Sequence, residues 1–183
     1  EVSFDRTIRN APHSRRLALD MAVLAAPQGA LFTTDADTMV GKGWIGKGCR
    51  LLSEGFDLIC EDVLLDEAEL SALPTQVREV GDTERAYLAL CDRLWRYWTR
   101  GCASTFVLRP SGASLVMKAS SYLRLGGLPT PPVGEDRALC DAMLGAGFAV
   151  KAMENFGTRT SARLTARALG GCGDTLAERA LSA

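Results

Sequence analysis

The feature that most constrains the fold is an alternation of amphipathic, helix-like segments with short apolar runs. The first four such segments are residues 14–26, 30–34, 44–54 and 56–63. Helix, strand, helix, strand in this order is typical of an α/β fold with a mostly parallel sheet flanked by helices. A chain of 183 residues is long enough for one such domain and too short for two, so we expect a single domain over residues 1–183.

The strongest helical pattern lies between residues 82 and 99. Its apolar side chains recur at spacings of three and four: Tyr87, Leu90, Cys91, Leu94, Trp95 and Trp98. This stripe predicts packing against the core; the alternative is that a Trp or Tyr on it lines a substrate groove. A further helix is expected over residues 136–146, a strand over 148–153 and a last short helix from about Asp174.

Charge and hydropathy exclude several classes of partner. Lys+Arg is 21 and Asp+Glu is 22, which gives a formal net charge of -1 with no basic patch for a nucleic acid. Pro27 and Gln28 interrupt the longest apolar run, so we expect no transmembrane segment. Residues 1–9 carry no secretory signal pattern, which favours a cytoplasmic location.

The cysteines do not form a zinc-binding pattern. None of the six stands in a CxxC pair, and the chain has a single histidine, His13. We expect reduced, mostly buried thiols, as in a cytosolic protein.

The most informative motif is TTDADT at residues 33–38. Asp35 and Asp37 follow an apolar run that predicts a buried strand, and side chains two apart in extended backbone project to the same side. The carboxyl end of a strand is where open α/β sheets bind ligands. Paired carboxylates there suit a hard cation such as Mg²⁺ or Mn²⁺; the alternative is a pair of acids on a solvated loop.

Two other segments are candidates for chemistry. Glu135 and Asp136 begin a predicted helix after a proline-rich loop, where a carboxylate serves either as a helix cap or as a general base. Gly112 lies between Ser111 and Ala113, and a glycine there either lets the backbone approach a ligand closely or makes an ordinary turn into a strand.

These motifs, in this order, resemble the family 2 glycosyltransferases of the GT-A fold. The resemblance runs through LFTTDADTMV, SGASLVMKASSYLRLGGLP and GEDRAL, with SRRLALDMA before them and TSARLTARALGGCGDTL after them. It covers residues from about 14 to 176 and is closest to bacterial members. The expected architecture is therefore the Rossmann-like, mostly parallel GT-A sheet.

The resemblance implies a role for each motif. Asp35 would approach the ribose or sugar hydroxyls of a nucleotide-diphosphate-sugar donor, and Asp37 would hold the divalent metal on its diphosphate. Asp136 would be the general base, with Glu135 shaping the acceptor site. Ser111 and Gly112 would border the donor sugar, and Arg15 would lie near the nucleotide. The reaction implied is an inverting transfer of the sugar to an acceptor hydroxyl.

Two departures from the family accompany the resemblance. The opening β-α segment with its Asn-Glu-Glu motif is not found, so we expect the N-terminal, nucleoside-binding portion to be missing or not represented. The only histidine, His13, precedes the aspartate pair, so it cannot be the late metal-binding histidine of some relatives.

Two alternative functions remain open from the sequence. A domain that binds a nucleotide-sugar or a partner protein without turnover would explain the missing segment. A phosphatase of the haloacid dehalogenase type also has a strand running into two aspartates, with Asp35 as nucleophile and Asp37 as acid/base. That family places Thr or Val where Met39 stands here, and no later pair of aspartates completes its metal site.

Overall fold

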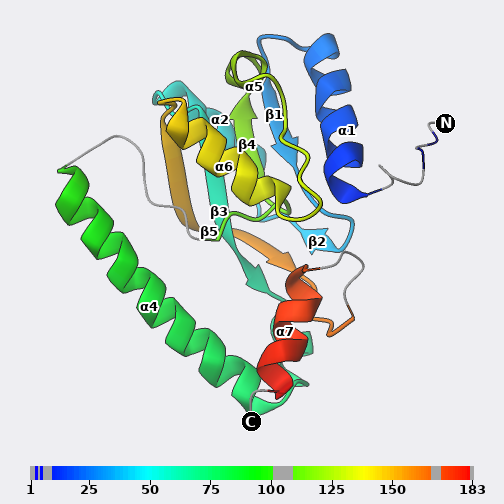
Figure 1. Cartoon of the computed structure of the whole chain (residues 1–183), viewed down its shortest axis with the longest axis vertical. Coiled ribbons are helices and arrows are strands. Elements are labelled where there is room, and N and C mark those ends of the chain that lie inside the picture. The colour runs from blue at the N-terminus through cyan, green and yellow to red at the C-terminus, as the bar shows by residue number, and fades with distance from the viewer. Residues whose placement is uncertain (1–2, 4, 6–9, 101–108, 166–169, 182–183) are drawn as a thin grey trace.

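The computed structural model describes residues 3, 5, 10–100, 109–165 and 170–181 (Figure 1). The elements in chain order are α1 (Ala11–Ala25), β1 (Ala30–Thr33), β2 (Thr38–Met39), α2 (Trp44–Ser53), β3 (Leu58–Leu65), α3 (Glu67–Ser71), α4 (Thr75–Thr99), β4 (Leu115–Lys118), α5 (Ala119–Leu125), α6 (Glu135–Gly145), β5 (Val150–Thr160) and α7 (Cys172–Leu181). Helices and strands thus alternate through most of the chain, as the sequence predicts.

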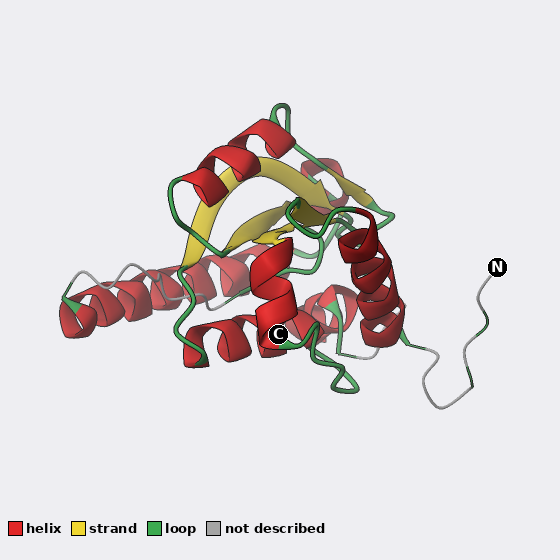
Figure 2. Ribbon diagram, turned by 90° about the horizontal axis from the view of Figure 1, so that it is seen from above, coloured by secondary structure: helices red, strands yellow, loops and turns green. Residues whose placement is uncertain are grey.

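The sheet is mixed and mostly antiparallel, so the expectation of a mostly parallel, Rossmann-like GT-A sheet is wrong. Its strand order is β1-β4-β3-β5-β2. The pairs β1–β4, β4–β3 and β5–β2 are antiparallel, and only β3–β5 is parallel among the described strands. Figure 2 shows that the sheet curls into a half-barrel with helices on both sides.

The physical reason for the difference is the short strand β4. It lies between β1 and β3, with Leu115 opposite both Thr33 and Cys60. From the sequence, this segment is expected only to be a turn leading into a strand, with no place in the sheet assigned to it. Because β4 reverses direction between them, β1 and β3 still run the same way, and β5 runs parallel to β3. The carboxyl ends of β1, β3 and β5 therefore meet at one edge.

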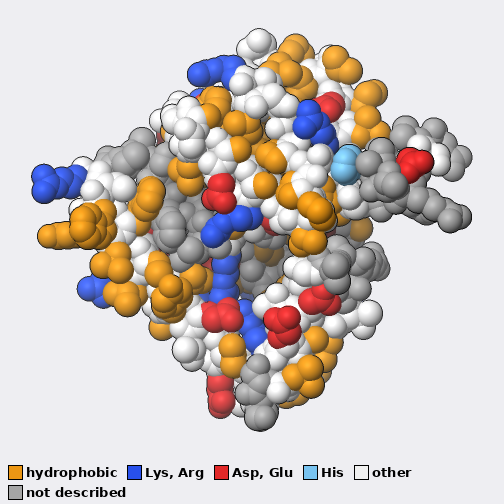
Figure 3. All heavy atoms as spheres, in the orientation of Figure 1, with side chains coloured by type: hydrophobic (Ala, Val, Ile, Leu, Met, Phe, Trp, Pro, Cys, Tyr) orange, Lys and Arg blue, Asp and Glu red, His pale blue; other side chains and the backbone are white. Residues whose placement is uncertain are grey.

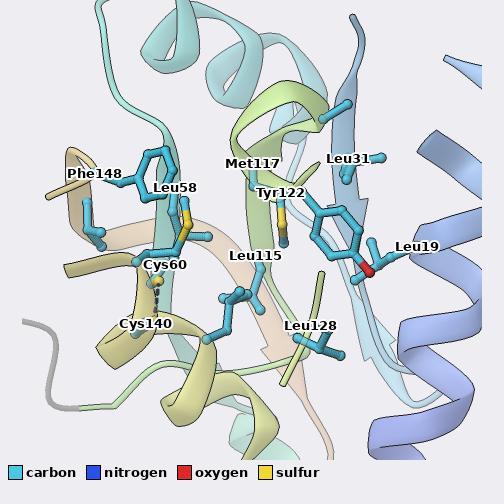
Figure 4. Packing of buried hydrophobic residues seen from close by; sticks show 14 of the residues in the cluster. Leu19, Leu31, Leu58, Cys60, Leu115, Met117, Tyr122, Leu128, Cys140 and Phe148 are labelled. Atoms are coloured by element: carbon cyan, nitrogen blue, oxygen red, sulfur yellow. Dashed lines mark hydrogen bonds between the residues drawn. The ribbon is translucent and has the colours of Figure 1, made fainter. Parts of the chain in front are cut away.

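Alternating side chains on the strands build two core layers. On one face, Leu58 and Cys60 of β3 and Leu115 and Met117 of β4 pack under α1, α5 and α6. Figure 4 shows these side chains facing Leu19, Tyr122 and Leu128. On the other face, Ile59 of β3 and Val116 of β4 pack against α2 through Trp44, Leu51 and Leu52. Burial of both faces fixes the register, since a slip of one residue would exchange the two layers.

A bulge in the β3–β5 pair produces the strong curl. Asp62 pairs with Glu154, but Leu64 already pairs with Arg159, so β5 carries extra residues at this point. Gly157 lies there with φ +86, a conformation that favours glycine. A Cβ on Gly41 would come within 2.1 Å of the Phe156 carbonyl oxygen, so the chain before α2 also passes directly over the bulge.

Helix α4 differs from the expectation. It begins at Thr75 rather than near residue 82, and only Val77 and Gly81 on it are buried. The apolar stripe predicted to pack in the core is largely exposed: Tyr87 is 63% exposed and Trp98 77%. The prediction of core packing for this stripe is wrong, because the helix extends past the sheet and contacts the body mainly through its first turns (Figure 1).

The first helix also begins earlier than predicted. It starts at Ala11 rather than at residue 14, and its N-cap is Asn10, whose side chain accepts a hydrogen bond from the backbone N–H of His13. Within the described residues, no helix is long and apolar enough to cross a membrane.

The five cysteines that the structure describes are free thiols, while Cys102 lies outside the described residues. Of these five, Cys60 and Cys140 are buried, so among the described cysteines the expectation of mostly buried thiols holds for two. Their Sγ atoms lie 3.0 Å apart between β3 and α6. The hydrogen bond between the two thiols and burial raise the pKa of the Cys60 thiol well above its usual value.

Asp57, just before β3, ties together three segments. Its carboxylate accepts hydrogen bonds from Ser121 Oγ at 2.7 Å and from the Ala149 backbone N–H at 3.0 Å, and it pairs with Lys118 at 3.4 Å. Burial raises the pKa of Asp57, but these hydrogen bonds and the Lys118 charge outweigh burial and lower it below its usual 3.8. The ionised carboxylate therefore stabilises the fold.

We predict that Asp57→Asn lowers the free energy of unfolding at neutral pH by about 1–3 kcal/mol, the typical loss for hydrogen bonds to a buried charge. The pKa of Asp57 is lower in the folded than in the unfolded protein. The stabilisation that the ionised Asp57 provides is therefore complete above pH 3.8 and is lost as the pH falls through the folded pKa. Urea unfolding at a series of pH values should show the difference from the parent shrinking toward acid. Asp82→Asn, at an exposed position, is the control; an equal effect of both variants would contradict the prediction.

Candidate functional site

A cleft with a volume of about 1200 Å³ opens at the edge where β1, β3 and β5 end. All seven residues singled out from the sequence line it: Arg15, Asp35, Asp37, Ser111, Gly112, Glu135 and Asp136. They come from α1, from the turn after β1, from the loop before β4 and from the start of α6. The fold thus brings four distant segments together at one place. Figure 3 shows basic and acidic side chains around the hollow on this face.

The Arg15 side chain connects these segments. Its Nη2 atom pairs with Asp35 Oδ1 at 2.8 Å, and its Nε atom pairs with Glu135 Oε1 at 3.1 Å. Its Nη1 atom donates a hydrogen bond to the Gly112 carbonyl oxygen. The Arg15 side chain is 15% exposed and Glu135 is 11% exposed, so this ion pair is shielded from water more than an ordinary surface pair. We call Arg15, Asp35, Gly112, Glu135 and Asp136 the Arg15 cluster.

Gly112 is held from both sides. Its carbonyl oxygen also accepts a hydrogen bond from Thr33 Oγ1 at 2.8 Å, and its N–H donates to Asp136 Oδ2 at 3.0 Å. A Cβ at this position would come within 2.6 Å of the Arg15 guanidinium. The close approach of the Arg15 guanidinium to the backbone therefore accounts for the glycine at position 112. From the sequence alone, a contact with a ligand and a simple turn into a strand are the two alternatives.

Asp136 lies on the first turn of α6, but it does not act as the N-cap. The N-cap is Gly134, which has φ 77 and no side chain to accept a hydrogen bond. Asp136 Oδ1 accepts from the Arg137 backbone N–H at 2.7 Å, and Oδ2 accepts from Gly112. These two N–H groups hold the carboxylate in one orientation toward the cleft that it lines.

Asp35 and Asp37 lie on a turn rather than in extended backbone. Strand β1 ends at Thr33, and the Thr38 N–H donates to the Asp35 carbonyl oxygen at 3.1 Å, which closes the turn. The two carboxylates have different partners: Asp35 pairs with Arg15, and Asp37 pairs with Arg163 from the segment after β5. Both still line the same cleft.

The chemistry of the donors decides which metal site is feasible here. Among the described residues, no group of three or more His, Cys, Asp or Glu side chains is placed to hold a metal ion. On this turn, Asp37 is the carboxylate outside the Arg15 cluster. Its side chain is 25% exposed to solvent. Mg²⁺ is commonly held by one or two carboxylates together with substrate phosphates and water. The donor set therefore fits a cation that arrives with a diphosphate, and it does not fit one held by protein alone.

The charged residues in the cleft that the sequence did not identify as site residues include Asp62, Glu84, Arg163 and Arg179. Glu84 of α4 pairs with Arg179 of α7 at 2.5 Å and also with Arg109. No short motif contains them, because they come from four separate elements. Of these residues, Arg163 alone lies in a segment that carries the family resemblance, TSARLTARALGGCGDTL.

Two described residues of the cleft have displaced pKa values: burial raises the pKa of the Cys172 thiol, and the other residue is Asp62. Burial raises the pKa of its carboxyl above the usual value, with Arg109 and Arg85 opposing this effect and Glu154 adding to it. Asp62 thus takes up a proton more readily than an ordinary aspartate, near the point where β3 and β5 separate at their bulge.

We predict that Arg15→Gln lowers the free energy of unfolding by about 2–3 kcal/mol, because it leaves Glu135 with no cation in a poorly hydrated position. The double variant Arg15→Gln/Glu135→Gln should lose less unfolding free energy than the two single variants lose together, since the unpaired charge of Glu135 is then gone. Chemical denaturation of the four proteins measures this coupling. Arg50→Gln, at an exposed position on α2, should change stability by less than about 0.5 kcal/mol; an Arg15 variant no less stable than this control would contradict the prediction.

Comparisons with known proteins identify no relative of this chain. No protein-family model matches it, and no curated protein matches it at a significant level. The resemblance to family 2 glycosyltransferases therefore rests on the sequence motifs alone.

Proposed function

We propose that the protein is a glycosyltransferase that moves a sugar from a nucleotide-diphosphate-sugar to an acceptor hydroxyl with inversion. The observation that carries this proposal is the meeting of the aspartate turn after β1 with the Glu135–Asp136 helix start in one cleft. Arg15 and Gly112 join these two parts through direct contacts. A donor-binding pair of acids and a positioned base must lie side by side for such a transfer.

The donor diphosphate would lie on the Asp37 side of the cleft. Arg109, Arg163 and Arg179 all line this cavity, and guanidinium groups form bidentate contacts with phosphate oxygens. Each of these arginines already pairs with Glu84 or Asp37. An incoming diphosphate would therefore displace the Glu84 and Asp37 carboxylates from these arginines. A divalent metal ion would offset the extra negative charge.

Asp37 is the residue that would hold the metal, as Mg²⁺ or Mn²⁺, together with diphosphate oxygens and water. The cation would neutralise charge that develops on the leaving diphosphate. The ion pair between Arg163 and Asp37 means that this arginine must move off the carboxylate when the cation binds. Asp35, held by Arg15, would then be left to accept hydrogen bonds from donor hydroxyls with its second oxygen.

Asp136 would be the general base. It would take the proton of the acceptor hydroxyl, whose oxygen then forms a bond to the anomeric carbon as the bond to the diphosphate oxygen breaks. The N–H groups of Gly112 and Arg137 fix its orientation, as a positioned base requires. Glu135, neutralised by Arg15, would shape the acceptor side instead of competing for the proton.

We predict that Asp136→Asn lowers the transfer rate by roughly 10²–10⁴, the typical contribution of a positioned base. Asparagine keeps the size and one acceptor oxygen, so donor binding should barely change. One of the two hydrogen bonds from the Gly112 and Arg137 backbone N–H groups is lost, so the melting temperature should fall modestly. The measurement is sugar transfer by the full-length protein, with Asp141→Asn on the exposed side of the same helix as the control. A transfer rate near that of the parent would rule out this base.

We also predict that Asp37→Ala removes the part of nucleoside diphosphate binding that depends on Mn²⁺. A ligand that binds only the folded state raises the melting temperature, so thermal shifts with nucleoside diphosphates, with and without Mn²⁺, report the binding. The parent should show a larger shift with Mn²⁺, and the variant should not. Asp141→Ala is the control. An equal Mn²⁺-dependent shift in the variant and the parent would contradict the metal assignment, and binding without turnover in the parent would favour a non-catalytic nucleotide-sugar-binding domain.

A further inference from the structure

Helix α4 carries an exposed apolar surface that the core does not use. We call Tyr87, Leu90, Leu94, Tyr97 and Trp98 the α4 apolar face; each is at least half exposed, from 50% for Leu90 and Leu94 to 77% for Tyr97 and Trp98. Figures 1 and 2 both show α4 at the edge of the molecule, projecting past the sheet. Figure 3 shows hydrophobic side chains gathered over it. A group of large apolar side chains of this kind marks an interaction surface.

The spacing of these residues makes one continuous stripe. Positions three, four and seven apart lie on one side of a helix, as Tyr87, Leu90, Leu94 and Trp98 do. The side that faces the body is different and begins with the buried Val77 and Gly81. Val77 packs with Leu176 of α7, and Glu84 pairs with Arg179 of α7. The first turns of α4 thus fix the helix, and its second half presents the apolar stripe outward.

The charges near the α4 apolar face are mainly positive. Arginines stand at positions 85, 93, 96 and 100, and the only acid between residues 85 and 100 is Asp92. Asp92 pairs with Arg96 at 2.6 Å. Arg93 and Arg100 are exposed, and in the described part of the chain neither has an acidic partner. At 100° per residue, Arg93 and Arg100 lie together along one border of the stripe.

These charges argue against a second copy of the chain as the occupant. A two-fold antiparallel pair of α4 helices centred on the apolar stripe would bring each helix's Arg93 border against the same border of its partner. Like charges placed opposite one another in such a pair are unfavourable. An anionic surface, in contrast, is complementary to the whole arginine border.

The aromatic side chains point to the same kind of surface. Tyr87, Tyr97 and Trp98 have an apolar ring and a polar tip, and such side chains favour the boundary between lipid tails and headgroups. An amphipathic helix with Trp and Leu on one side and arginines beside them binds in the plane of that boundary without crossing it. Helix α4 is indeed not apolar enough to cross a membrane.

We propose that the α4 apolar face binds an anionic lipid surface. Leu90, Leu94 and Trp98 enter the boundary of the acyl chains, and Arg93 and Arg100 contact lipid phosphates. Glu84, on the same helix just before the stripe, lines the cleft, so binding holds the cleft close to the lipid headgroups. The inference stands on α4 alone and does not depend on the proposed transfer reaction.

Co-sedimentation with vesicles tests this proposal. The protein should sediment with vesicles that contain phosphatidylglycerol, much less with vesicles of phosphatidylcholine alone, and less as salt is added. Leu94→Glu/Trp98→Glu should abolish binding. Arg93→Gln/Arg100→Gln should weaken it by about thirtyfold, the factor expected for two arginines at an anionic surface. Leu24→Glu, at a site on α1 that is 78% exposed, is the matched control and should bind like the parent.

Three results would overturn the proposal. The first is failure of the parent to bind anionic vesicles. The second is equal binding by the parent and the Leu94→Glu/Trp98→Glu variant when both have the same circular dichroism and melting temperature. The third is a dimer of the parent in sedimentation velocity that is lost in this variant, with no vesicle binding by either protein; this result would assign the α4 apolar face to self-association.

Discussion

The Arg15 guanidinium is the contact on which the geometry of the cleft depends. Its three nitrogens reach Asp35, Glu135 and the Gly112 carbonyl oxygen, which belong to the turn after β1, the start of α6 and the loop before β4. Segments of this kind have few apolar contacts of their own, so the contacts of the Arg15 guanidinium hold them in place, as side-chain packing does elsewhere. Its planar fork can satisfy acceptors in several directions at once, which a lysine ammonium on a flexible stem does less well. Gly112 has no side chain because the guanidinium occupies that space.

The direction of the strands places this cation and its partners. Although most neighbouring pairs are antiparallel, β1, β3 and β5 run the same way because β4 is inserted between β1 and β3. The edge that a parallel sheet would offer for ligand binding is therefore also present in this mixed sheet. Strand β4 adds its own start to that edge, which brings Gly112 beside Thr33. The seven residues singled out from the sequence thus line one cleft at this edge, although the expected mostly parallel sheet is wrong.

The sequence predicted the elements better than their arrangement, for identifiable reasons. Helical periodicity and glycine ends gave α2 and α6 almost to the residue, because both depend on local signals. Strand β4 has only four residues and no alternation, so nothing local revealed its position in the sheet. The periodicity of α4 correctly indicated an amphipathic helix, but a pattern of this kind says only that one side is apolar and not what covers it. Cleft residues within short motifs, such as Asp35 and Asp136, could be found; Glu84 and Arg179, which meet only through the packing of α4 on α7, could not.

The pairing of charges in the cleft suggests how it is prepared for a ligand. Its acids are Asp35, Asp37, Asp62, Glu84, Glu135 and Asp136, and its arginines are Arg15, Arg109, Arg137, Arg163 and Arg179. Arg15 is mostly buried, and its contacts hold the loops, so exchanging them would cost stability. Arg163 and Asp37 are more exposed, at 36% and 25%, and water screens an exposed pair so that it contributes little. In the proposed reaction, a phosphate-bearing ligand would therefore take Arg163 from Asp37 at small cost while the Arg15 cluster stays in place. The proposal thus divides the cleft into a fixed half around Asp136 and an exchangeable half around Asp37, and this division follows from the burial of Arg15 and Glu135 and the greater exposure of Arg163.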